Sequence, residues 1–149
     1  MRKLAVLAAV VVVAGCRGDD GGGTTRGEWA AEANQVCRAY GRRIAALGTP
    51  TTPAGAEGFI RRAIPIAREE VVKLRELDAP EADAAKIDRM LDQVEQGIGA
   101  LQGVLSARAG GDQAAVDEAT QRGRRASDAS NRIARELGAS ECAATPSSS

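Results

Sequence analysis

The most regular group of acidic side chains is Asp88, Asp92 and Glu95, whose spacings of four and three residues put them on one side of a helix. Carboxylates in this pattern could bind a metal ion or act as an acid and a base. Such sites usually include histidine, and the chain contains none. A second carboxylate motif of the di-iron type is also missing. We therefore interpret these acids as a solvated, ion-paired helix flank, and we predict neither a metal site nor a cofactor.

Nucleophilic catalysis is also poorly supported by the residue types. A nucleophile needs a base within hydrogen-bond reach, and the chain offers three Cys, one Tyr and no His. No pattern in the sequence pairs a nucleophile with a base. We predict that the protein is not an enzyme.

The first sixteen residues have the pattern of an export signal. Two basic residues precede the apolar run Leu4–Val13, which is too short to span a bilayer. The motif Val13-Ala14-Gly15-Cys16 that follows resembles the lipobox of bacterial lipoproteins. The resemblance implies that residues 1–15 are a signal peptide and that lipidated Cys16 anchors the chain on the extracytoplasmic face of the cell membrane. The alternative is an ordinary cleaved signal followed by an incidental cysteine.

The two remaining cysteines, Cys37 and Cys142, lie near opposite ends of the exported chain. Disulfide bonds persist outside the cytoplasm, and no histidine is present to activate a thiolate. Two isolated cysteines are also too few for a zinc site. We predict that Cys37 and Cys142 form a disulfide that closes a loop of about one hundred residues.

Apolar residues recur every three or four positions in four segments, which predicts four amphipathic helices. Aromatic residues make up only 2% of the chain, so the core must consist of small and aliphatic side chains, and these favour helices over a sheet. The links are short, which indicates an all-α, up-and-down four-helix bundle over residues 28–142. A flexible, glycine-rich tether over residues 16–27 should precede it, and a disordered tail over residues 143–149 should follow.

Particular residues predict the ends and the packing of these helices. The first helix should run from Glu28 to Leu47, and Thr52 should cap the second helix. Pro65 predicts a kink within the second helix. The third helix should end before Gly110, and the fourth should lie between Asp112 and Gly138.

Small residues predict two further features. Those between Ala119 and Ser130 should let the fourth helix approach a neighbour closely. The third helix carries three glycines that could admit a neighbouring backbone or open a ligand groove: Gly97, Gly99 and Gly103.

Arginines repeat every seven residues beside the apolar stripe of the second helix, at Arg61, Arg68 and Arg75. Folding this helix back on the third about the link Asp78–Pro80 places Arg75 opposite Asp88 and Arg68 opposite Glu95. We predict that these are structural ion pairs that fix the register of the two helices, each contributing about 1 kcal/mol or less.

The charge balance limits the classes of partner. The whole chain has 20 basic and 20 acidic residues, and removal of the signal peptide leaves 18 and 20. A near-neutral surface predicts that the protein does not bind nucleic acid. The pairs Arg42-Arg43, Arg61-Arg62 and Arg124-Arg125 could form an anion-binding surface, although the acids between them favour an ordinary solvated surface.

Several features together resemble small helical lipoproteins of high-GC bacteria, a group without an assigned function: the lipobox, the glycine-rich tether, the segment Ala33-Asn34-Gln35-Val36-Cys37, and Leu137-Gly138 followed by Cys142. The resemblance implies location and fold but no activity. We predict a non-catalytic interaction module that is anchored to the membrane by its lipid and contacts another envelope protein or the cell wall. The alternative is binding of a small apolar or amphipathic ligand between the helices, which would require an apolar cavity of several hundred Å³.

Overall fold

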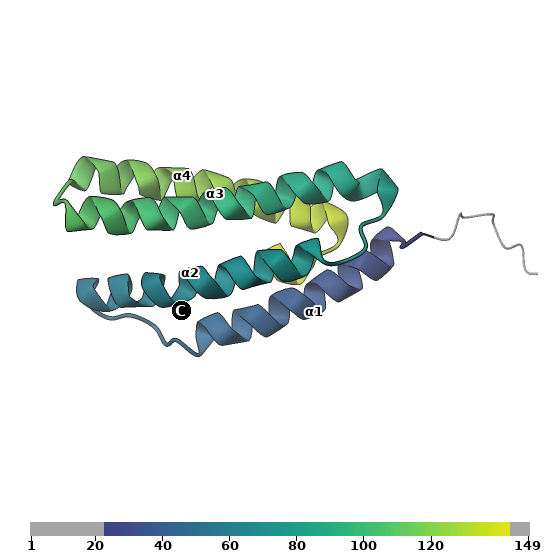
Figure 1. The fold of residues 1–149 in the computed structure, drawn as a ribbon, viewed down its shortest axis with the longest axis horizontal. Coiled ribbons are helices and arrows are strands. Elements are labelled where there is room, and N and C mark those ends of the chain that lie inside the picture. The colour runs from purple at the N-terminus through teal and green to yellow at the C-terminus, as the bar shows by residue number, and fades with distance from the viewer. Residues whose placement is uncertain (1–22, 144–149) are drawn as a thin grey trace, which may run out of the picture.

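The computed structural model describes residues 23–143, which form an all-α, up-and-down four-helix bundle (Figure 1). The elements are α1 (Arg26–Ala45), α2 (Pro53–Arg75), the short 3₁₀ helix η1 (Glu81–Asp83), α3 (Ala84–Ala109), α4 (Gln113–Leu137) and the 3₁₀ helix η2 (Ser140–Ala143). Consecutive helices run in opposite directions, with α1 and α2 in one layer and α3 and α4 in the other. The predicted signal peptide and Cys16 lie outside the described residues, as does the tail beyond residue 143.

The first helix begins two residues before its predicted start. Thr25 and Glu28 form a capping box, in which the Thr25 hydroxyl accepts from the Glu28 backbone N–H at 3.3 Å. The Glu28 carboxylate in turn accepts from the Thr25 backbone N–H at 2.8 Å. Because these bonds satisfy free N–H groups at the helix end, Arg26 and Gly27 are helical rather than part of the predicted tether.

The first helix ends at Ala45, two residues before its predicted end at Leu47, whereas the predicted ends of the other helices are confirmed. Thr52 accepts from the backbone N–H of Gly55, and Asp112 accepts from that of Ala115. Gly138 ends α4 with a φ of 82°, a conformation that glycine adopts without steric cost. Pro65 lies inside α2, which continues through it without interruption, so the kink expected there stays a prediction.

The main hydrophobic core lies at the end of the bundle where α1 begins and α4 ends. Trp29 is fully buried there, and Leu137 from α4 and Leu91 from α3 belong to the same cluster. The 3₁₀ helix η2 packs against both α1 and α4. Its last residue, Ala143, is buried in this core, so the folded domain includes a residue that the sequence assigned to the disordered tail.

Helices α3 and α4 pack closely along small residues, as predicted. A methyl group added at Gly123 would lie 3.3 Å from the Ala100 Cβ, and one added at Gly103 would lie 3.3 Å from the Ala119 Cβ. These distances are shorter than ordinary contacts, so a side chain at either position would push the helices apart. The absence of a side chain at Gly103 therefore lets α4 approach α3 closely at Ala119.

The link between α2 and α3 is longer than predicted, because it spans residues 76–83 and contains η1. Asp83 at the end of η1 is buried and receives two hydrogen bonds from Arg26 of α1. The Arg26 Nε lies 2.7 Å from Oδ2 of Asp83, and its Nη2 lies 2.6 Å from Oδ1. These bonds lower the pKa of the Asp83 carboxyl and join the link to the start of the chain's first helix.

The predicted ion pairs between α2 and α3 are wrong in register. The two helices are antiparallel neighbours, but Arg75 Nη2 lies 3.4 Å from Asp92 Oδ1 and 3.2 Å from Glu95 Oε2, rather than beside Asp88. Glu95 therefore pairs with Arg75 instead of Arg68. The physical reason is the longer link, and the two partners of Arg75 lie four and seven residues further along α3 than predicted, about one and two helical turns.

Candidate functional site

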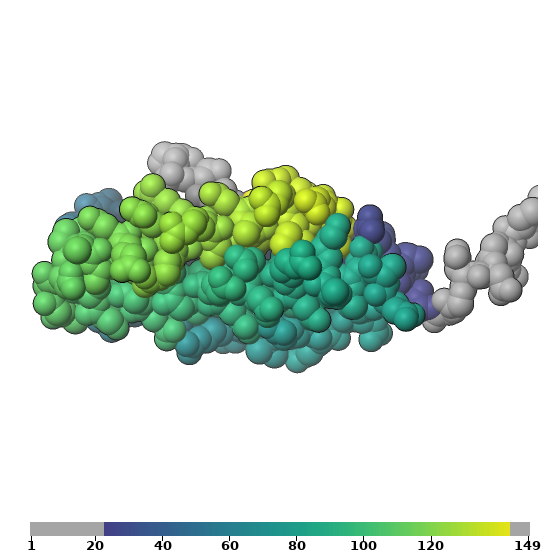
Figure 2. Space-filling model, turned by 90° about the horizontal axis from the view of Figure 1, so that it is seen from above, coloured from purple at the N-terminus to yellow at the C-terminus, as the bar shows by residue number. Residues whose placement is uncertain are grey.

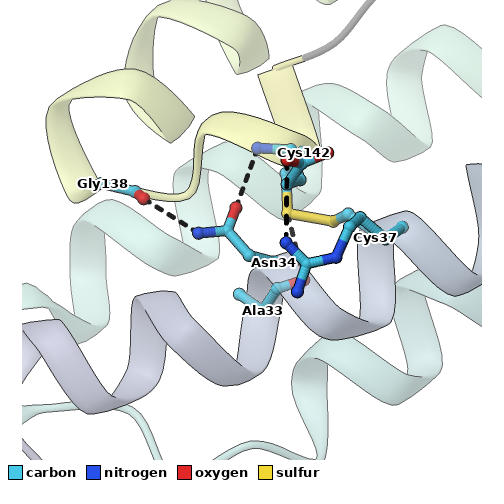
Figure 3. A network of polar contacts seen from close by, with 7 residues as sticks. Ala33, Asn34, Cys37, Gly138 and Cys142 are labelled. Carbon is cyan, nitrogen blue, oxygen red and sulfur yellow. Dashed lines mark hydrogen bonds and ion pairs between the residues drawn. A yellow bond between two sulfur atoms is a disulfide. The ribbon is translucent and has the colours of Figure 1, made fainter.

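The predicted disulfide between Cys37 and Cys142 is present and joins α1 to η2 (Figure 3). Asn34, one turn before Cys37, strengthens the same junction. Its side-chain N–H donates to the Gly138 carbonyl at 3.1 Å, and its side-chain oxygen accepts from the Glu141 backbone N–H at 2.8 Å. Both thiols are consumed by the bond, so this junction is a structural support for the bundle.

A groove of about 430 Å³ follows the outer seam between α2 and α3. Buried Val71 and Ile98 form its floor together with Gly99, which has no side chain. Val72 lies on the rim and is 54% exposed, which is unusual for a large apolar side chain in this protein. The complete lining is Arg68, Val71, Val72, Arg75, Glu95, Ile98, Gly99 and Gln102.

Charged side chains stand at the rim of this α2–α3 groove. Arg75 is engaged with two acids of α3, whereas Arg68 forms no ion pair among residues 23–143. Of the four residues that the sequence predicted as ion-pair partners, the structure brings Arg68, Arg75 and Glu95 to the groove, and Asp88 is not part of its lining. The groove therefore has an apolar floor and, at its rim, an arginine without an ion-pair partner among the described residues.

A second depression, of about 440 Å³, lies between α3 and α4. Helices α3 and α4 lie side by side on the face that Figure 2 shows. The floor of the depression consists of small residues, and its polar side chains come from both helices. The lining is Gln93, Gln96, Gly99, Ala100, Arg122, Arg125 and Ala126. Arg122 is held by Glu118 one turn earlier, with 2.6 Å between its Nη1 and the Glu118 Oε1.

Glu70 on α2 is a half-buried carboxyl group that the sequence reading did not single out. Burial raises its pKa to about 7, and no ion pair to it is present among the described residues. The sequence does indicate this burial. Position 70 is four residues from both Ile66 and Leu74, which places Glu70 at the edge of the buried face of α2. A lone carboxyl group without a paired nucleophile or second acid does not make a catalytic site.

Comparison of the chain with protein-family models, curated proteins and solved structures found no match. No helix within residues 23–143 is long and apolar enough to cross a membrane. The same residues contain no cluster of three or more His, Cys, Asp or Glu side chains that could hold a metal ion.

Four depressions on the described residues, of about 200 to 540 Å³, are open to solvent rather than enclosed by the bundle. The two described above differ in chemistry. The α2–α3 groove offers an apolar floor with a cationic rim, and the α3–α4 depression offers amide and guanidinium groups. Both are suited to binding from the surface.

Proposed function

We propose that the protein is a lipid-anchored, extracytoplasmic module of the cell envelope that binds a partner protein through its surface and does not catalyse a reaction. The observation that carries this proposal is the α2–α3 groove, where exposed Val72 adjoins an apolar floor. A groove that remains open along the seam of two helices offers a partner the apolar contact area on which most binding energy depends.

The shape and charge of the groove favour an amphipathic segment of the partner as its occupant. A helix can lay apolar residues along a groove between two helices, with anchors every three or four positions. Arg68 at the rim would then pair with a carboxylate beside those anchors, which would supply both orientation and specificity. We therefore propose an acidic, amphipathic helix of an envelope protein.

A small amphipathic anion is the second candidate for the same groove. Its volume of about 430 Å³ falls in the range of small-molecule sites, and the apolar floor would hold a hydrocarbon chain. An open groove buries less of such a ligand than an enclosed cavity does, so this candidate ranks below a protein segment.

Photocrosslinking from Val72 in intact cells tests the groove. A photoreactive amino acid at position 72 of the full chain is expected to capture one envelope protein, whereas the same group at exposed Gln121 of α4 should not. Capture should be lost in a chain that also carries Arg68→Glu and kept in one that carries Arg132→Glu, because Arg68 borders the groove and Arg132 does not. Capture that is indifferent to Arg68, or capture of a small molecule alone, would exclude a protein partner at this surface.

Cys16→Ala is expected to release the protein from the membrane fraction, because the proposed diacylglycerol thioether cannot form without the thiol. The measurement is the distribution of the full chain between membrane and soluble fractions, together with partitioning into detergent. Cys37→Ser combined with Cys142→Ser is the control, since it removes both disulfide-bonded cysteines of the folded domain without leaving a free thiol and should leave partitioning unchanged. Retention of the Cys16→Ala variant in the membrane fraction would rule out lipidation as the anchor.

A further inference from the structure

Ionised side chains are unevenly distributed along the bundle. We define the distal half as residues 36–64 and 97–125, which form the end that contains the α1–α2 and α3–α4 links (Figure 1). It carries nine arginines and four carboxylates, a net charge of +5. The remaining described residues, the proximal half, carry eight basic residues and fourteen carboxylates, a net charge of −6. Although the net charge of the described residues is close to zero, one end of the bundle is basic and the other is acidic.

The few acids of the distal half are already engaged within the domain. Glu57 pairs with Arg108, Glu118 pairs with Arg122, Asp112 caps α4, and Asp117 accepts a hydrogen bond from the Gln113 side chain. Five distal arginines have no ion-pair partner among the described residues: Arg42, Arg61, Arg62, Arg124 and Arg125. Their positive charges are therefore available to an external anion.

These five arginines do not lie on one flat face. They are carried by α1 and α2 in one layer and by α4 in the other. Neighbours such as Arg61 and Arg62 also point about 100° apart around their helix. A planar lipid surface could contact only part of this set, whereas a flexible chain of negative charges can follow it around the end of the bundle.

The α3–α4 depression lies at the edge of the distal half and is lined by Gln93, Gln96, Arg122 and Arg125. Guanidinium groups bind carboxylate or phosphate oxygens through charge-assisted hydrogen bonds, and amide groups can both donate to and accept from hydroxyl groups. A sugar unit with an anionic substituent presents both kinds of partner. The small residues of the floor, including Ala100 and Ala126, leave room for a sugar ring against the helices.

We propose that the distal half binds an anionic polysaccharide of the cell envelope, with one charged sugar unit held in the α3–α4 depression. This proposal rests on the proposed function in one respect, because the extracytoplasmic location is what brings the protein to the polysaccharide. The binding itself does not depend on the lipid anchor. Residue 26, where α1 begins, lies at the opposite, acidic end, so the proposed attachment through Cys16 would leave the basic end facing away from the membrane.

Binding of the full chain, purified in detergent, to polygalacturonate tests this proposal. We expect saturable binding that weakens as salt is raised and no binding to neutral dextran, because screening acts on exposed charges. Arg122→Gln combined with Arg125→Gln should weaken binding by at least about tenfold, because it removes the unpaired charge of Arg125 and the N–H donors of Arg122 that its Nη1 contact with Glu118 leaves unused. Arg132→Gln combined with Arg135→Gln is the matched control, since it removes the same charge from the proximal part of α4, and we expect a change of less than about twofold.

The outcomes separate this proposal from its alternatives. Equal weakening by both double variants would show attraction by total charge without a site, and would overturn the proposal. Binding to phosphatidylglycerol vesicles without binding to polygalacturonate would overturn it in favour of a lipid surface. A positive result with polygalacturonate together with membrane release failing for Cys16→Ala would refute the anchor and leave the polysaccharide site standing.

Discussion

Reduction of the Cys37–Cys142 disulfide is expected to lower the melting temperature of the domain by roughly 15 °C or more. The bond links residues 105 positions apart, and in the chain-entropy model a loop of this length contributes about 4 to 5 kcal/mol by restricting the unfolded chain. Helicity at 25 °C should remain nearly unchanged, because the apolar faces of the four helices stabilise the folded state independently of the bond. Thermal melts followed by circular dichroism, with and without reductant, make the measurement.

Two variants identify the origin of the effect. A chain with Cys37→Ser and Cys142→Ser should melt at the temperature of the reduced wild type and should not respond to reductant. Asn34→Ala keeps the disulfide but removes two hydrogen bonds at the same junction, and a loss of about 2 kcal/mol is expected. A shift of only a few degrees on reduction, or loss of helicity at 25 °C, would contradict the assigned role of the bond.

The features that the sequence predicted well are those set by local chemistry. A helix end depends on hydrogen bonds within a few residues, so Thr52, Asp112 and Gly138 could be assigned from their types and positions. The capping box at Thr25 uses the same chemistry and could have been found from the spacing of Thr25 and Glu28. The close approach of α3 and α4 was also predictable, because small residues recur on one side of α4.

The register of α2 and α3 could not be predicted from local chemistry. Side chains across a hairpin pair according to the length of the link, and the sequence did not reveal that η1 would extend it from Asp78–Pro80 to residues 76–83. The partly buried contact between Arg26 and Asp83 belongs to the same link and joins residues 57 positions apart. No local pattern relates two such positions, so this contact required the tertiary structure.

The candidate binding surfaces could also be predicted only in part from the sequence. The heptad of arginines correctly placed Arg68 and Arg75 at the α2–α3 edge, but the groove between them also needs Gly99 of α3 and an exposed Val72. The two ends of the bundle combine residues from all four helices, so a sequence total near zero could not show that one end is basic and the other acidic. The α2–α3 groove and the uneven distribution of charge therefore both arise only when the chain folds.

Replacement of Glu70 by Gln is expected to raise the free energy of unfolding at pH 8 by on the order of 2 kcal/mol and to change it little near pH 4. Burial raises the pKa of Glu70 to about 7 in the folded state, from an ordinary value of 4.5. Below the ordinary value the carboxyl group is protonated in both states, so no penalty arises. Between pH 4.5 and 7 the unfolded chain loses this proton first, and stability falls until the folded state is ionised as well.

Glu69, the adjacent residue on α2, is the matched control because its pKa is shifted in the opposite direction. Its carboxylate accepts a hydrogen bond from Arg43 at 2.7 Å, which lowers the pKa. Glu69 therefore stabilises the fold above its ordinary pKa, and this contribution is lost as the pH falls through the lowered value. Glu69→Gln should keep the decline in stability from pH 5 to 8, whereas Glu70→Gln should flatten it. Denaturant unfolding across that range makes the comparison, and parallel curves for wild type and Glu70→Gln would mean that this carboxyl group is solvated in the folded protein.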